Sequence, residues 1–254
     1  MFSASDKHIL SFHDVGFSYD GKKSFIQDIS MSVANSAFIG LLGANGSGKS
    51  TILKLASGIL RPLSGRIKLW NKDLQTYRNR DRAKLLSYLP QFLDMNIPFT
   101  VREFVEMGLY PYDTLPELTV DDAIGMVGLT EYSESLITHI SGGEKRRVYI
   151  AMTLMQGAGL VLLDEPLANL DIKYQMELIR LLRDLQENRN ITVVMALHDI
   201  NIAFQFENIL LIKEGSIIGS GKPEEMLTKE MLKLAFDIDI ELKKEDSGGI
   251  YIKY

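Results

Sequence analysis

The stretch AFIGLLGANGSGKSTILKLASGIL, residues 37–60, runs from an apolar segment through a glycine-rich loop into an amphipathic segment. Its middle, residues 43–51, matches the pattern G-x-x-x-x-G-K-[ST] of a phosphate-binding loop. The apolar segment predicts a buried strand, and Gly58 and Pro62 predict the end of the helix that follows the loop. The stretch therefore predicts an α/β fold of the P-loop NTPase type, with phosphates held at a helix N-terminus.

Each residue type in this loop suits a phosphate chain. Glycines let backbone N–H groups wrap the phosphates, Lys49 adds charge toward the β- and γ-phosphates, and the Ser50 hydroxyl can hold Mg²⁺. The alternative, a flexible turn, needs one glycine and gains nothing from a lysine that opposes the helix dipole. The predicted nucleotide-binding residues are Gly43, Ala44, Asn45, Gly46, Ser47, Gly48, Lys49, Ser50 and Thr51.

The composition of the 254 residues is that of an ordinary globular protein, with 46% hydrophobic and 24% charged residues. A net charge of -5 does not suggest nucleic acid as a partner, and the lack of cysteine excludes disulfides and cysteine-ligated metals. The N-terminus shows no signal-peptide pattern, and the apolar runs are far shorter than the ~18 residues of a membrane-spanning helix. We expect a soluble chain.

The pattern along the chain predicts an α/β core interrupted by a helical insertion. Residues 9–19 and 25–33 are β-rich, with a turn at Asn35 and Ser36. After the insertion, strands and helices alternate, which favours a parallel sheet. The predicted organisation is one domain, 1–254, with the core at 1–91 and 157–236, the helical insertion at 92–156, and a tail at 237–254 that adds small strands.

A second candidate for the nucleotide site is LVLLDE, residues 160–165, an apolar strand that ends in two acids. A single carboxylate there could be a solvated surface group. Two acids at the carboxyl edge of a parallel sheet suit a metal contact and a base. We expect Asp164 to hold the metal and Glu165 to polarise the attacking water.

The stretch ISGGEKRR, residues 140–147, resembles a second phosphate loop. A capping box explains Ser141 and Glu144. It does not explain Gly142 and Gly143, since each glycine costs about 1 kcal/mol inside a helix. It also leaves the basic residues 145–147 at the wrong end of the dipole, which predicts an anion at this helix start.

These segments together resemble the nucleotide-binding subunits of ATP-binding cassette (ABC) transporters along nearly the whole chain. GANGSGKST is similar to their Walker A motif, LVLLDE to Walker B, and ISGGEKRR to their signature sequence. The resemblance implies an ABC-type nucleotide-binding domain with an N-terminal antiparallel β subdomain and an inserted all-helical subdomain. It also implies ATP, Mg²⁺ and a head-to-tail dimer, in which the signature of one copy completes the site of the other.

The resemblance extends to four further residues. Gln91 in YLPQ is similar to the Q-loop glutamine that senses the metal and γ-phosphate, and Asp171 in LANLD to the D-loop acid at the dimer interface. His198 in ALHD resembles the histidine that contacts the γ-phosphate. Tyr19 in FSYD resembles the aromatic that stacks on adenine. Taken alone, Gln91 could be a loop amide, His198 a surface residue at a strand end, and Tyr19 a residue that packs on the core.

The segments PFTVREFVEMGLYPY, residues 98–112, and LHDINIAFQF, residues 197–206, resemble subunits that serve iron-chelate, haem and cobalamin importers. This implies membrane permease subunits as partners, indirectly a substrate-binding protein, and a place on the cytoplasmic face of the inner membrane. An ABC ATPase for another cargo, an exporter subunit and a soluble iron–sulfur assembly ATPase are the alternatives. The apolar residues expected to dock the permease are Phe92, Leu93, Met95, Ile97 and Phe99.

Overall fold

The computed structural model describes residues 7–93, 96, 98–112, 118–168, 170–237, 241–244 and 250–253. The chain divides into two compact units. We call Met1–Gln75 with Val194–Tyr254 the P-loop unit, and Thr76–Val193 the helical unit. Strand β8 (Thr192–Leu197) carries the chain from the helical unit back into the P-loop unit.

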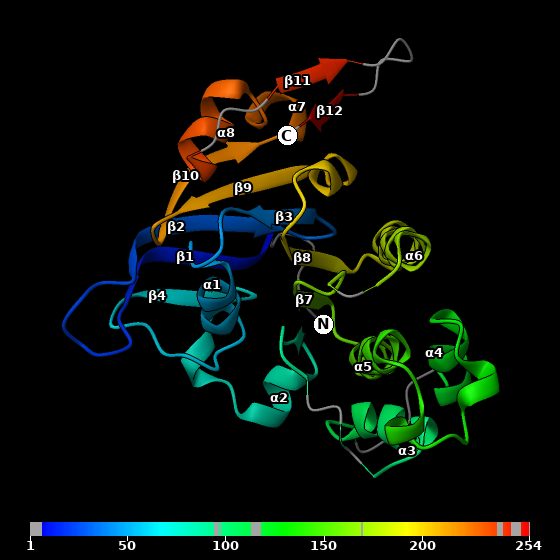
Figure 1. Cartoon of the computed structure of the whole chain (residues 1–254). Coiled ribbons are helices and arrows are strands. Elements are labelled where there is room, and N and C mark those ends of the chain that lie inside the picture. Colours follow the sequence, from blue (N-terminus) through cyan, green and yellow to red (C-terminus); the bar gives the residue numbers. More distant parts are fainter. Residues whose placement is uncertain are drawn as a thin grey trace. The chain divides into compact units, whose positions relative to one another are not determined.

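The P-loop unit contains the antiparallel sheet that the N-terminal sequence predicts. Its strands lie in the order β2-β1-β4-β5, and β1 pairs antiparallel with both β2 and β4 (Figure 1, blue and cyan). The turn after β2 falls at Asn35 and Ser36, as predicted, and Ser36 takes a φ of 55° there. The strands of this sheet are β1 (His8–Phe17), β2 (Ile26–Ala34), β4 (Ser64–Leu69) and β5 (Lys72–Asp73).

The strand that leads into the phosphate loop is β3 (Phe38–Leu42), which is buried along its whole length. It pairs in parallel with β9 (Asn208–Lys213), and β9 pairs antiparallel with β10 (Ser216–Gly221). Continuous apolar sequence is typical of parallel strands because both of their faces are covered. The phosphate loop then enters helix α1 (Lys49–Ala56), which ends before Gly58, as the sequence predicts.

The remaining elements of the P-loop unit come from the C-terminal part of the sequence. Its described helices are the 3-10 helix η5 (Asn201–Gln205), α7 (Pro223–Met226) and α8 (Lys229–Phe236). The described tail adds an antiparallel pair, β11 (Glu241–Lys244) and β12 (Ile250–Lys253).

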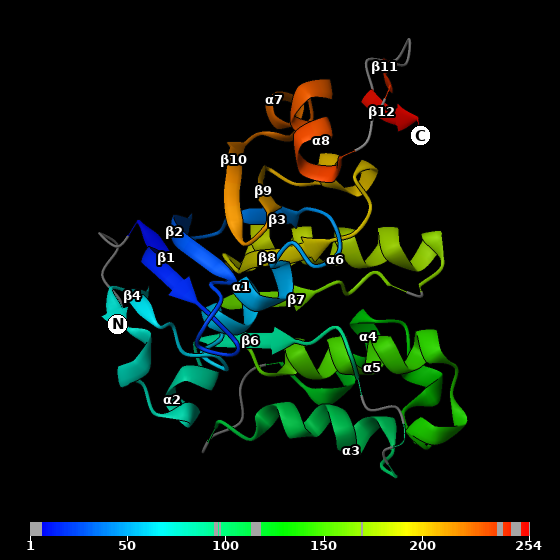
Figure 2. The same cartoon turned by 60° about the vertical axis from the view of Figure 1, so that its left-hand side comes forward.

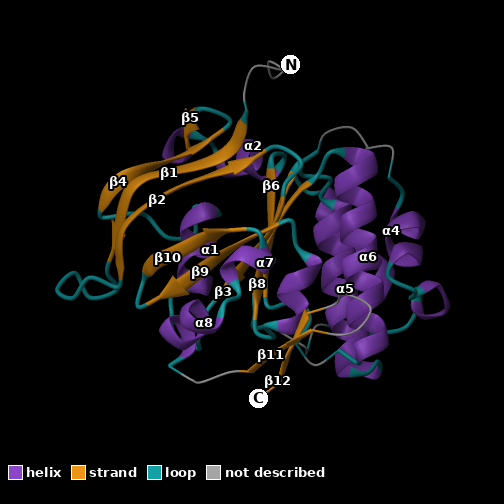
Figure 3. Cartoon of the chain, turned by 90° about the horizontal axis from the view of Figure 1, so that it is seen from above, coloured by secondary structure: helices purple, strands orange, loops and turns teal. Residues whose placement is uncertain are grey.

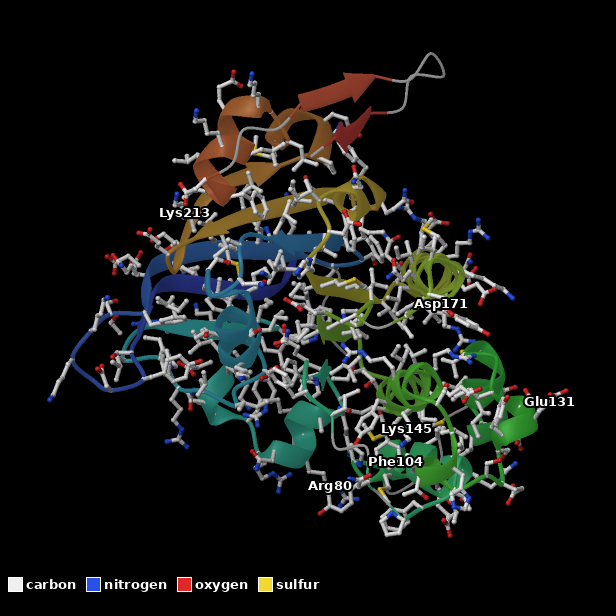
Figure 4. The ribbon with its side chains drawn as sticks, viewed as in Figure 1. Arg80, Phe104, Glu131, Lys145, Asp171 and Lys213 are labelled. Atoms are coloured by element: carbon white, nitrogen blue, oxygen red, sulfur yellow. The ribbon has the colours of Figure 1, made fainter. Side chains whose placement is uncertain are left out.

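The helical unit bears out the predicted change of character after the first third of the chain. Helix α3 packs on α5 through the rings of Phe104 and Tyr149, whose centroids lie 4.7 Å apart (Figure 4 labels Phe104). Figures 2 and 3 show α4 beside α5. The described helices between β6 (Leu86–Leu89) and β7 (Leu160–Asp164) are α3 (Val101–Glu106), η2 (Met107–Leu109), α4 (Val120–Met126), η3 (Thr130–Tyr132), η4 (Ile137–His139) and α5 (Gly142–Met155).

Two parallel strands in the helical unit position the carboxylates. Strand β6 (Leu86–Leu89) pairs in parallel with β7 (Leu160–Asp164), and the last matched pair is Leu89 with Leu163. The 3-10 helix η1 (Leu74–Thr76) ends on the first residue of this unit, which also contains α2 (Asn79–Ala83) and α6 (Ile172–Arg189). Among the helices described, none is long and apolar enough to cross a membrane.

Candidate functional site

The phosphate loop occupies the turn between β3 and α1, as predicted, and its geometry demands glycine. Gly46 and Gly48 have φ values of +77° and +114°, which residues with a Cβ rarely adopt. At Gly43 a Cβ would lie 2.2 Å from the Ile212 carbonyl oxygen and 2.7 Å from the Ser47 Oγ. The loop backbone at Gly43 therefore lies too close to its neighbours to admit a side chain.

The polar groups of the loop are turned inward. The buried Lys49 ammonium donates to the carbonyl oxygens of Gly43 at 2.8 Å and Ala44 at 3.2 Å, so its charge lies across the loop. The Ser47 hydroxyl is buried without a hydrogen-bond partner in the described part of the chain. An unpartnered buried hydroxyl carries a desolvation cost that an added acceptor can relieve. The loop therefore fits a phosphate group.

Tyr19 lies beside the phosphate loop with its ring available to a ligand. Its hydroxyl and the Thr51 Oγ1 are 2.9 Å apart, and its ring meets Phe17 and Phe25 edge-on. The side chain is nevertheless 61% exposed. Nearby, Asp20 accepts hydrogen bonds from the backbone N–H groups of Lys22 and Lys23, which lower its pKa from 3.8 to about 2 and order this loop.

His198 follows β8 and shares a pocket with the phosphate loop. The open pocket, of about 470 Å³, is lined by Gly43, Ala44, Asn45, His198, Asp199, Ile200 and Phe236. The imidazole is exposed, so a ligand in the pocket can reach it. The structure thus brings His198, Tyr19 and the predicted phosphate-binding residues together within the P-loop unit.

The helical unit brings together the predicted glutamine and the predicted base. Gln91 Nε2 donates to Glu165 Oε2 at 2.7 Å. Each residue lies two positions beyond the matched pair Leu89 and Leu163, so the parallel register carries both to the same edge. Glu165 takes a φ of 50°, an uncommon backbone for a residue other than glycine and one that clusters at functional sites.

Asp164 lies at the end of β7 and is 1% exposed. The Tyr88 hydroxyl donates to its Oδ2 at 3.3 Å. A buried carboxylate needs partners that offset its desolvation, and a bound cation is the strongest of these. Tyr88 is a site residue that the sequence analysis missed, because a tyrosine in a strand is ordinarily taken for a core residue.

The signature residues start α5, and the expected capping box forms. Ser141 Oγ accepts from the Glu144 N–H at 3.3 Å, and Glu144 Oε2 accepts from the Ser141 N–H at 2.7 Å. These bonds to Ser141 lower the pKa of Glu144, with smaller contributions from Tyr132 and Arg147. A Cβ on Gly142 would meet nothing within 4 Å in the described chain, so packing inside this chain does not call for glycine there.

Two of the three basic residues that follow the signature do not need an anion to satisfy their charge. Arg146 and Arg147 are buried, and both donate to backbone carbonyls rather than facing an anion at the helix start. Arg147 binds the carbonyls of Val127 and Gly128, and its guanidinium lies over the Tyr174 ring. The apolar run VYIAM at residues 148–152, directly after the two arginines, was the sequence signal that this part of the helix is buried.

Asp171 is the N-cap residue of α6 and is exposed (Figure 4). Its side chain makes no capping hydrogen bond to the helix. An exposed acid at a helix start that does not cap its own helix is available to a partner group.

The donor set suits a hard cation. The described residues hold no cluster of three or more His, Cys, Asp or Glu side chains that could hold a metal ion. Mg²⁺ is commonly held through one or two carboxylates plus substrate phosphates and water. The residues that the sequence predicts as Mg²⁺ ligands, Ser50, Asp164 and Gln91, carry oxygen donors of that chemical kind.

Comparison with known proteins places these features in one family. A family model described as ABC transporter matches residues 26–168. The chain is 37% identical over 225 residues to the petrobactin import ATP-binding protein FpuC of Bacillus anthracis, covering 85% of this chain and 83% of that protein. It is 36% identical over 241 residues to the iron(3+)-hydroxamate import ATP-binding protein FhuC of Bacillus subtilis, covering 92% and 89%.

A solved structure agrees with these likenesses. It is a dimeric ATP-binding cassette in a post-hydrolysis state, bound to ADP and Pi. It matches with a TM-score of 0.76 and 25% identity over 84% of this chain and 98% of that one. The family match spans the phosphate loop, Gln91, the signature and the paired acids, and the likeness covers most of the chain. This chain therefore belongs to the ABC transporter family, as one of its ATP-binding, ATP-hydrolysing proteins.

Proposed function

We propose that this chain powers the uptake of an iron-chelate-type substrate through a separate membrane permease. Its likeness to ATP-binding proteins for petrobactin and iron(3+)-hydroxamate import supports this substrate class. The observation that carries the mechanism is the 2.7 Å contact between Gln91 and Glu165. It joins the residue expected to sense metal and phosphate to the group expected to polarise water.

The nucleotide is held by groups that each match a part of ATP. Tyr19 offers its exposed ring to adenine, and Lys49 offers its charge to the β- and γ-phosphates. Ser50, Gln91 and Asp164 are the ligands for Mg²⁺, which when bound neutralises charge on the phosphates. The residues that cradle the phosphate chain are Gly43, Ala44, Asn45, Gly46, Ser47, Gly48 and Thr51.

Hydrolysis depends on positioning and electrostatics rather than on a covalent intermediate. Glu165 accepts hydrogen bonds from the attacking water and orients it. His198 contacts the γ-phosphate and stabilises the charge that develops there. Both residues lie at carboxyl ends of strands, β7 and β8, where open α/β sheets bind their ligands.

The signature acts on the nucleotide of a second copy. Gly142 has open space around its Cα and no steric need within this chain, so an approaching phosphate explains it. Ser141, Gly143 and Glu144 complete that surface, and Asp171 faces the partner. The dimeric ATP-binding cassette among the structural relatives supports a head-to-tail pair of this chain.

The permease docks beside Gln91. Phe92 follows the glutamine and is 86% exposed, and Phe99, further along the same segment, is also exposed, so both aromatic side chains are accessible to a partner. Met95 and Ile97, predicted for the same surface, lie outside the described residues. The permease holds the chain at the cytoplasmic face of the inner membrane, where a substrate-binding protein acts on it indirectly.

The functional organisation that we propose is one ATPase domain over residues 1–254. The nucleotide-binding core is 1–91 with 157–236, the signature subdomain is 92–156, and the tail is 237–254. The compact units divide differently, because β6, β7 and α6 group with the helices of Thr76–Val193. We divide the chain by which residues are proposed to bind the nucleotide, whereas the two compact units reflect the packing of the backbone.

Reconstitution tests the proposal. The permease that co-purifies with this chain is placed in liposomes with the chain outside and its substrate-binding protein in the lumen. The release of a ferric hydroxamate from the lumen is then measured with ATP. We expect transport from the lumen to the side that carries this chain, and none with the Glu165→Gln variant. ATP hydrolysis without movement of any iron chelate would refute the substrate class, and movement in the opposite direction would refute import.

A further inference from the structure

Arg146 is a buried cation that binds backbone rather than a carboxylate partner. The residue is 4% exposed and lies in the second turn of α5. Its guanidinium donates to four carbonyl oxygens, those of Gln91 at 2.9 Å, Pro166 at 3.1 Å, Asp164 at 3.3 Å and, at a shorter distance, Glu165. One side chain thus satisfies a whole cluster of carbonyls.

These carbonyls belong to two segments that no strand ladder joins. The matched pairs of β6 and β7 end at Leu89 and Leu163, before Gln91 and Glu165. Beyond that point the backbones have lost their pairing along the strands. Arg146 spans both segments, because a planar guanidinium presents five donors in a fixed fork. We call these hydrogen bonds of Arg146 the bridge; it sets the distance between the segment at Gln91 and the segment at Glu165.

Burying the Arg146 guanidinium carries a desolvation cost, which indicates a role beyond packing. Burial lowers the pKa of Arg146, and the charges of Asp164 and Glu165 act in the opposite direction. An arginine in a protein stays charged, so this cation is held within the helical unit close to two acids. A buried ionic group is weak support for stability, since apolar side chains of similar volume often do as well.

We propose that Arg146 is a positioning residue for hydrolysis, which fixes Gln91 and Glu165 relative to each other and links them to the signature loop. The link arises because Arg146 lies on the helix that Ser141 caps, so a shift of the signature displaces the guanidinium and the four carbonyls with it. The occupancy of one site of the dimer is thereby communicated to the other. The inference rests on the roles proposed for Gln91, Glu165 and the signature.

The chain offers a matched control in the adjacent residue. Arg147 is also buried on α5 and also donates to backbone carbonyls, but to those of Val127 and Gly128 rather than to the carbonyls that Arg146 binds. Arg147→Lys therefore reproduces the loss of a buried guanidinium without touching the bridge. Lys145→Gln, one residue earlier, controls for the loss of a charge on the same helix (Figure 4 labels Lys145).

The experiment measures ATPase kcat and KM, per ATP-binding protomer, for Arg146→Lys, Arg146→Gln and both controls, beside melting curves. A misplacement of about 1 Å can cost about 10²-fold in rate, so we expect kcat to fall roughly 10- to 100-fold for both Arg146 variants. We expect KM for ATP to stay close to the wild-type value. Arg146→Lys keeps the charge but not the fork, so it separates position from electrostatics.

The outcomes distinguish this inference from the proposed function. Wild-type kcat in Arg146→Lys, or an equal fall in Arg147→Lys, would overturn the positioning role, whatever the melting temperatures are. Because kcat is expressed per ATP-binding protomer, the rate of the folded fraction is obtained even from a partly unfolded sample. Glu165→Gln is the reference: if it hydrolyses normally, the site roles are wrong, and if it is inactive while Arg146→Lys is normal, only this inference fails.

Discussion

The substitution Glu165→Gln isolates the proposed base, because the structure shows what it preserves. The glutamine amide oxygen can accept the hydrogen bond that Gln91 donates to Glu165 Oε2 at 2.7 Å. The backbone at φ 50° is unaffected, since both side chains branch beyond Cβ. Arg146 binds the main-chain carbonyl of this residue, which the substitution leaves in place. The change therefore removes the negative charge and the proton-accepting capacity of the side chain, while its shape and its hydrogen bond from Gln91 can be kept.

The expected fall in hydrolysis rate is that for the loss of a general base. Loss of a positioned base costs on the order of 10²- to 10⁴-fold in rate. Since each factor of ten corresponds to about 1.36 kcal/mol, the barrier rises by about 2.7–5.4 kcal/mol. Glu165 is only half-buried, so we expect the free energy of unfolding to change by no more than about 0.5 kcal/mol.

The assay combines phosphate release at saturating Mg²⁺ and ATP with equilibrium binding of ATP and a thermal melt. We expect kcat to fall at least about 10²-fold while the Kd for ATP and the Tm stay near the wild-type values. Turnover like that of the wild type would refute the role of Glu165 as base. A parallel loss of ATP affinity would instead show that the carboxylate belongs to the binding surface.

Two further predictions concern the partners. Ser141→Arg should prevent ATP-driven dimerisation while sparing ATP binding, because a long cation blocks the approach to Gly142. Sedimentation in a Glu165→Gln background checks this, and a stable dimer would contradict it. Phe92→Ser should leave the fold and ATP binding intact but weaken capture of the permease from detergent-solubilised membranes, because the ring is exposed in this chain. A large fall in Tm would show that Phe92 is a core residue. Undiminished capture would show that the permease docks on another surface.

The phosphate loop was predictable from sequence because consecutive residues supply all of its parts. The glycines, Lys49 and the flanking strand and helix lie within one short stretch, and the loop forms between β3 and α1 as expected. The capping box at Ser141 and Glu144 was predictable for the same reason, since both groups lie within one helical turn. Local chemistry needs no knowledge of distant residues.

The contacts between distant segments were decided by tertiary structure alone. The bond between Gln91 and Glu165 depends on the parallel register of β6 and β7, and the contact of Tyr19 with Thr51 depends on where a loop of one sheet comes to rest against α1. The sequence shows the charges of Arg146 and Arg147 but not their burial against backbone carbonyls. Whether a cation faces solvent, an anion or a set of carbonyls is determined by the packing around it, which involves residues far away in the chain.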